Sequence, residues 1–355
     1  MASEIIAWLT VAALAAATVL FCRWLDPRPL LPPQRVRAVP WSGPEALLAV
    51  VIVLLVPGLV RGAIGLPGHS EGELWGVVLA APVQAALVLF CLYRLSGTRP
   101  YQLGVTCRRF LPNARLGCLA WLLVTPSVLV LHGLVSYVHA ELFPGEPEVH
   151  PLERYARAGL TPAEWGLLAV TALAAAPALE ELLFRGVLQP WFICRSQGGV
   201  AALIGSAVFA LLSRPRLEEA LRRQDISAII IELLPLAFVL ALVPLYALAP
   251  LLVRRWLPRA EVARGLLGTA LLFAVSHAFV WPTPVPLFVL GLALGWLAWR
   301  TQSLVAPFVL HSLFNAVATL ALVLTHAGEP TKGNEATTAA RVPPGVTTST
   351  AVPGS

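Results

Sequence analysis

Long apolar stretches separated by short polar loops dominate this 355-residue chain. Each stretch approaches or exceeds the roughly 20 residues that an α-helix needs to cross a bilayer, and none alternates with the period of two that barrel strands show. The pattern therefore predicts an all-α, polytopic transmembrane bundle of about eight to ten helices. The expected spans are 5–25, 45–64, 74–93, 116–138, 164–184, 198–213, 227–252, 265–281, 285–299 and 303–325.

The segments between and beyond these spans also carry signals. Residues 214–225 alternate Arg and Glu with Leu, which favours a short amphipathic helix at the membrane surface. Residues 327–355 consist mostly of Thr, Pro, Gly, Ala and Ser and cannot build a core, so we expect a disordered tail. The first span lacks a basic start and a small-residue cleavage site, which indicates a retained helix rather than a signal peptide.

These features divide the chain into three parts. Residues 1–160 would form N-terminal transmembrane helices, residues 161–326 a core, and residues 327–355 the tail. The core contains a stretch from about 214 to 264 that looks inserted.

Composition narrows the class of protein. Hydrophobic residues make up 57% of the chain and charged residues 12%, and the mean hydropathy is +0.77. A soluble domain carries about 25% charged residues, so too few polar side chains remain here to cover a soluble surface. These values exclude a cytosolic enzyme and a disordered protein, and make membrane lipids the expected surroundings.

The net charge of +6 comes mainly from arginines in the loops. Their distribution follows the positive-inside rule and predicts no nucleic-acid partner. It places the N-terminus outside and the first and third loops in the cytoplasm. The rule fails around 227–252, because arginines flank this span on both sides. The five cysteines show no metal-ligand spacing.

A pair of acidic residues ends the 164–184 stretch. Glu181 and Arg185 are four residues apart, so they share a helical face and can form an ion pair. Glu180 points about 100° away from Glu181 and is not neutralised by the same arginine. Charges inside apolar spans are costly and often functional. The alternative is a helix end among lipid headgroups.

Two further motifs place imidazoles in apolar surroundings. His277 ends the sequence Phe273-Ala-Val-Ser-His277, and His311 lies four residues before Asn315 on one helical face. Each alone is compatible with a structural hydrogen bond between helices. Together with Glu180 they predict one polar cavity, because buried polar groups must find partners or water. A carboxylate and two imidazoles can activate a water molecule. The zinc-protease motif HExxH is absent.

Three motifs in this order resemble the CPBP family of intramembrane proteases, which is also called Abi or CAAX-protease-like and includes the type II CAAX prenyl endopeptidases. The family pattern EExxxR, FxxxH and HxxxN reads here as Glu180 to Arg185, Phe273 to His277 and His311 to Asn315. The resemblance covers about 160–325. One departure is that the segment expected to carry FxxxH ends in Ser213.

The resemblance implies hydrolysis of a peptide bond in a membrane-associated peptide or protein. Glu180 would be the general base, His277 would position the water, and His311 with Asn315 would stabilise the oxyanion. Glu181 and Arg185 would support the pocket. The resemblance leaves open whether the reaction uses a zinc ion held by Glu180, His277 and His311 or proceeds without a metal.

Two other readings remain. One is a catalytically silent binding or bacteriocin-immunity-type protein on the same scaffold, and the other is a transporter with an ionisable midplane site. The Arg-, Ala- and Pro-rich composition favours a bacterial plasma membrane.

Overall fold

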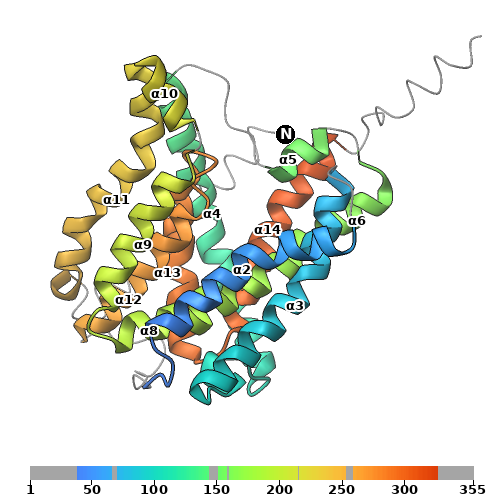
Figure 1. Cartoon of the computed structure of the whole chain (residues 1–355), viewed down its shortest axis with the longest axis vertical. Coiled ribbons are helices and arrows are strands. Elements are labelled where there is room, and N and C mark those ends of the chain that lie inside the picture. The colour runs from blue at the N-terminus through green and yellow to red at the C-terminus, as the bar shows by residue number, and fades with distance from the viewer. Residues whose placement is uncertain are drawn as a thin grey trace, which may run out of the picture.

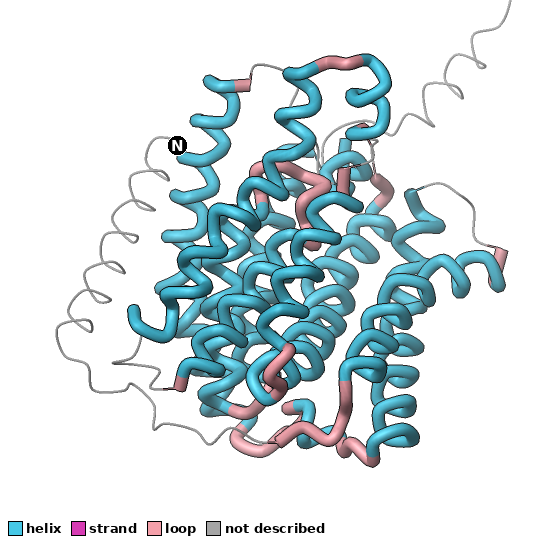
Figure 2. Tube along the Cα trace, turned by 60° about the vertical axis from the view of Figure 1, so that its left-hand side comes forward, coloured by secondary structure: helices cyan, strands magenta, loops and turns pink. Residues whose placement is uncertain are grey.

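The computed structural model describes residues 38–65, 70–143, 151–157, 160–214, 216–252 and 259–326. Every regular element in these ranges is a helix, as predicted (Figures 1 and 2). The expected first span 5–25 and the tail 327–355 lie outside the described residues.

The N-terminal part of the described chain contributes three long helices. Ser42 precedes α2, and its amide donates a 2.7 Å hydrogen bond to Glu45, as in a capping box. Helix α2 packs against α3, whereas α4 packs against α13 and α14. The elements are α2 (Gly43–Ala63), α3 (Ser70–Ser96), η1 (Pro100–Leu103), α4 (Phe110–Leu142) and α5 (Pro151–Arg157).

A continuous helical run follows and changes its winding twice. Two π-helical segments, η2 and η3, interrupt it, and Pro177 and Pro190 follow them closely. Each proline lacks the amide hydrogen that would close an α-helical turn, which favours a locally widened helix. The run comprises α6 (Pro162–Val170), η2 (Thr171–Ala175), α7 (Ala176–Glu180), η3 (Glu181–Leu188) and α8 (Gln189–Cys194).

The remaining helices surround α12, which is buried along almost its whole length. It packs against α8, α9, α11 and α13. Glycines permit this close approach: a Cβ added at Gly268 would lie 2.6 Å from the Cβ of Ala202 on α9. The elements are α9 (Gly198–Leu212), α10 (Leu217–Arg223), α11 (Ile226–Leu252), α12 (Ala260–Val275), α13 (Pro284–Thr301) and α14 (Val305–His326).

Seven helices of the described residues are long and apolar enough to cross a membrane, or eight if the bent pair of α9 and α10 forms one span. The protein is therefore an integral, multi-pass membrane protein. Helix α12 has only 16 residues and does not belong to this set. In Figure 1, α4 and α14 lie between α11 on one side and α3 on the other.

Two features differ from or refine the predicted pattern. The predicted span 265–281 ends early, at Val275, and residues 276–283 form a turn. Pro282 has no amide hydrogen with which to continue a helix through residue 282, so α12 and α13 do not merge into one span. The amphipathic segment 214–225 contains α10, whose ion pair Glu218–Arg222 is about three-quarters exposed.

Candidate active site

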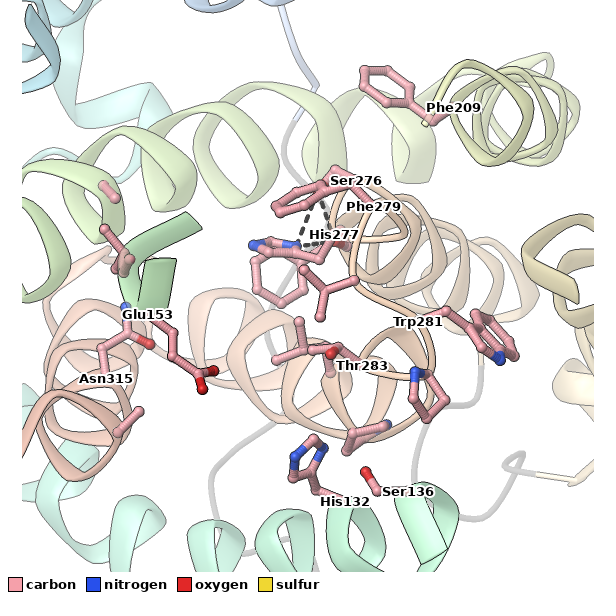
Figure 3. Close-up of a pocket in the computed structure, with 18 of the residues that line it drawn as sticks. His132, Ser136, Glu153, Phe209, Ser276, His277, Phe279, Trp281, Thr283 and Asn315 are labelled. Carbon is pink, nitrogen blue, oxygen red and sulfur yellow. Dashed lines mark hydrogen bonds between the residues drawn. The ribbon is translucent and has the colours of Figure 1, made fainter. Parts of the chain in front are cut away.

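A cavity of about 1420 Å³ contains the side chains that the sequence singled out. Its walls come from α4, α7, α10, α11, α14 and the turn 276–283, and it includes Glu180, His277, His311 and Asn315. In the close-up view, His277, Asn315 and the α4 residues His132 and Ser136 approach this pocket from three separate elements (Figure 3).

Glu181 lies at the centre of a buried ion-pair network. Its Oε1 atom accepts hydrogen bonds from Arg185 Nη1 at 3.1 Å and from His311 Nδ1 at 2.8 Å. The three side chains are at most 5% exposed. The ion pair expected from the four-residue spacing is therefore formed. Glu181 also fixes the His311 ring, because a donating Nδ1 directs Nε2 away from Glu181.

Glu180 has a different environment from its neighbour. Its Oε2 atom lies 3.8 Å from His311 Nε2, which is beyond hydrogen-bonding distance, and has no hydrogen-bond partner among the described residues. Its side chain is 26% exposed, and it lines the cavity. The change from α- to π-helix falls between the two glutamates. Glu181 therefore serves Arg185 and His311, while Glu180 faces the cavity.

His277 reaches the cavity from the turn and not from a membrane helix. Its Nδ1 donates a 2.9 Å hydrogen bond to the Phe273 carbonyl and lies 3.3 Å from Ser276 Oγ. These contacts fix the ring and leave Nε2 as the acceptor of a neutral imidazole. Figure 3 shows the second ring nitrogen directed away from these contacts. The prediction that His277 lies within a span is wrong, because α12 ends two residues before it.

Asn315 joins α14 to the first π-helical segment. Its Nδ2 donates a 2.8 Å hydrogen bond to the carbonyl of Ala172 in η2. This bond uses one N–H of the side-chain amide, and the second N–H can donate to another group. Asn315 lies on the cavity wall together with His311, as their four-residue spacing predicted.

The ring of Phe273 connects the charged network with His277. The guanidinium of Arg185 lies 4.2 Å from its centroid, in a cation–π contact. The rings of His277 and His311 lie 5.1 and 5.7 Å from it, both edge to face. The phenylalanine of this motif therefore separates the two imidazoles and packs against both. This role of the phenylalanine was not predicted from the motif.

Sequence reasoning also missed the α4 wall of the cavity. His132, Ser136 and His139 line it, from one face of a helix that was read only as a membrane span. Their spacing of four and three residues was a signal, because such positions share a helical face. The hydroxyl of Ser276 lies next to the His277 ring, 3.3 Å from Nδ1.

The donor set was tested against a zinc site. Zinc needs ligand atoms that converge at about 2.0–2.2 Å from one point. The described residues contain no group of three or more His, Cys, Asp or Glu side chains arranged to hold a metal ion. Each imidazole donates its Nδ1 hydrogen, His311 to Glu181 and His277 to the Phe273 carbonyl, and keeps Nε2 for another partner. A zinc ion held by Glu180, His277 and His311 stays a prediction, and we derive no step through one.

Comparison with known proteins gives one match. The family model described as "Type II CAAX prenyl endopeptidase Rce1-like" matches residues 162–249 and 246–317. This region begins with α6 and ends two residues after Asn315, so it contains all the cavity residues named by the three motifs. The search of curated proteins and the search of solved structures each returned no match.

Proposed function

Residues 162–317 match the Type II CAAX prenyl endopeptidase Rce1-like family, and from this premise we propose that the protein is an intramembrane endopeptidase. Its reaction is hydrolysis of a peptide bond in a membrane-associated substrate by water that Glu180 activates. The family match supports a protease of this type, and the geometry of the cavity supports the assignment of roles.

The environment of Glu180 carries this proposal. A general base needs a carboxylate that no structural partner neutralises. Glu181 binds Arg185 and His311, whereas Glu180 Oε2 has only the 3.8 Å approach to His311 Nε2. Catalytic hydrogen bonds are often long in the free enzyme and shorten when substrate binds. An unsatisfied buried polar atom also needs a physical explanation, and a water-activating role supplies one.

His311 is placed to act on a substrate oxygen through its second ring nitrogen. Nδ1 donates to Glu181 Oε1, so Nε2 is the atom directed toward Glu180 and the cavity. The proposed oxyanion role requires a hydrogen on Nε2 during the reaction, so that both ring nitrogens donate in that step.

The proposed reaction proceeds through a tetrahedral intermediate. Glu180 takes a proton from water, and the resulting hydroxide attacks the carbonyl carbon of the scissile bond. His277 Nε2 accepts a hydrogen bond that orients this water, while His311 Nε2 and the second N–H of Asn315 stabilise the oxyanion. The C–N bond then breaks, Glu180 transfers its proton to the leaving amine, and the products are a carboxylate and an amine.

The substrate class is membrane-associated peptides or proteins. The cavity opens among helices that cross the membrane, and its walls combine apolar side chains with the polar groups of the site. A bacterial plasma membrane fits the Arg-, Ala- and Pro-rich composition, and we place the activity there.

The direct experiment measures cleavage of a library of membrane-anchored peptides by the purified protein in lipid nanodiscs. Glu180→Ala is compared with the wild type, and general acid–base catalysis predicts a loss of about 10²- to 10⁴-fold. Glu261→Gln is the matched control, because this exposed carboxylate lies in the first turn of α12, away from the cavity. Equal turnover by wild type and Glu180→Ala contradicts the proposal. No turnover by the wild type favours a catalytically silent binding protein.

A further inference from the structure

A second buried ion pair lies beside the proposed site, formed by Arg214 and Glu232. Arg214 Nε and Nη2 donate hydrogen bonds to the two carboxylate oxygens of Glu232 at 2.8 and 3.1 Å. The side chains are 2% and 7% exposed. Two parallel bonds of this kind fix the relative position of both groups more firmly than a single contact does.

The position of this pair in the chain is unusual. Glu232 lies in α11, an apolar membrane span, and Arg214 follows the end of α9. A charge inside such a span is expensive and marks a functional requirement more often than a packing one. Arg214 was counted among the loop charges when the positive-inside rule was applied, but its side chain is buried. Its burial explains part of the conflict in loop charges around α11.

The third donor of Arg214 reaches the turn that carries His277. Arg214 Nη1 donates a 3.1 Å hydrogen bond to the carbonyl of Ala278, the residue directly after His277. The turn itself is held by short-range bonds, such as those from the amide of Val280 to His277 and from Thr283 to Val280. Ala278 is fully buried. One guanidinium therefore connects α9, α11 and the backbone next to a cavity imidazole.

We propose that Arg214 and Glu232 are positioning residues that hold the 276–283 turn, and with it His277, against the cavity. This inference rests on the proposed function, since it assigns His277 a task in the reaction. Glu232 orients the Arg214 guanidinium, and Arg214 fixes the Ala278 carbonyl. The backbone before it then carries His277, whose ring is directed by the Phe273 carbonyl.

The location of the pair has a consequence for the inserted-looking stretch. Both residues lie in the 214–264 segment, which separates His277 from Glu180 along the chain. Because His277 lies in a turn beyond the end of α12, its position is less fixed than that of a helical residue. The 214–264 segment constrains the position of His277 through the side chain of Arg214.

The first test removes both charges together. The variant Arg214→Met with Glu232→Leu leaves no buried charge alone, and such replacements commonly preserve the fold. We expect kcat for peptide cleavage to fall about 10-fold with KM unchanged, because a displaced His277 affects the chemical step. The matched control, Arg222→Met with Glu218→Leu, removes an exposed ion pair of α10 whose two side chains do not line the cavity. It should retain wild-type kinetics.

The second test measures hydrogen–deuterium exchange of the same variants in nanodiscs. Positioning predicts faster exchange in peptides that cover 276–283, with α12 and α13 unchanged. Unchanged exchange in this turn overturns the proposal. Faster exchange throughout α9, α11 and α12 would also overturn it, because the pair would then serve general packing. A rise in KM with unchanged kcat in the first test would overturn it as well.

The two tests separate this inference from the proposed function. If the wild type cleaves nothing, the proposed function fails, yet the exchange measurement still shows whether Arg214 holds the turn. If the wild type cleaves and depends on Glu180, but the double variant retains full kcat, the function stands and the positioning role fails.

Discussion

Two buried ion-pair clusters differ in how completely their polar atoms are used. In the first, Glu181, Arg185 and His311 bind one another, yet Glu180 Oε2, Glu181 Oε2 and two Arg185 nitrogens have no hydrogen-bond partner among the described residues. In the second, Arg214 and Glu232 form two bonds with each other and a third with Ala278. No atom of the second pair is among the buried groups without a partner.

This contrast separates a site that can react from one that holds a structure. Unsatisfied buried polar atoms are rare in folded proteins, because each loses its hydrogen bonds with water. Glu180 lies on the cavity wall, where water or substrate can complete its bonding. In the second pair, Arg214 directs its donors to Glu232 and to the Ala278 carbonyl, and so fixes the backbone that it touches. Burial alone would not distinguish the two clusters.

The largest effect is expected from replacing a glutamate with glutamine in the first cluster. The same replacement in the second cluster provides the comparison. Glu181→Gln removes the carboxylate that binds both Arg185 and His311, so we expect turnover to fall on the order of 10³-fold. Glu232→Gln removes the carboxylate that binds Arg214 but should lower turnover no more than about 10-fold. Both should lose about 3–5 kcal/mol of stability, since each strands a buried charge.

Steady-state kinetics in nanodiscs and thermal unfolding of the same samples provide the comparison. If Glu232→Gln loses as much turnover as Glu181→Gln, the two clusters do not have the separate roles assigned to them.

An intermediate effect is expected for Asn315→Ala. The change removes an oxyanion donor and the bond to the Ala172 carbonyl, and loss of one such donor lowers kcat by about 10²-fold. The control is Leu324→Ala on the same helix, whose side chain is 79% exposed. Single-turnover cleavage measures both variants. A rise in KM with kcat unchanged would show that Asn315 contributes only to ground-state binding of the substrate.

The smallest effect is expected from Gly268→Ala, which tests whether the Arg214–Glu232 pair depends on the packing of α9 against α12. Gly268→Ala places a Cβ 2.6 Å from the Cβ of Ala202 and moves α9 away from α12. We expect a stability loss of about 1–3 kcal/mol from overpacking, with a turnover loss of a few-fold because Arg214 follows α9. Gly58→Ala on α2 meets no atom within 4 Å and should change neither property. Thermal unfolding and kinetics that rank the two variants equally would contradict this dependence.

Hydrophobic pattern was sufficient for most of the fold. Nine of the ten expected spans fall on described helices, with α2, α3, α4, α11, α13 and α14 close to the expected bounds. Helix α12 was predicted at 265–281 but runs from Ala260 to Val275, and the hydrophobic pattern alone did not show that it ends before His277. The two π-helical segments were not predictable either, since winding depends on neighbouring helices as well as on proline.

The candidate site was predictable where spacing within one helix decides it. The Glu181–Arg185 ion pair follows from a four-residue separation, and so does the common face of His311 and Asn315. Contacts between distant segments were not predictable from one sequence. Arg214 was read as a loop charge, although it pairs with Glu232. The spacing also gave no indication that the Phe273 ring would pack between two imidazoles.

The most direct test is an experimental structure of the wild-type protein in lipid at a resolution that shows ordered water. The central claim is that Glu180, unlike Glu181, faces a hydrated cavity without a protein partner. The account predicts a water molecule within about 3.2 Å of the Glu180 carboxylate, with the rings of His277 and His311 facing the same solvent. A Glu180 side chain that pairs with a protein cation, or that faces lipid, would contradict it.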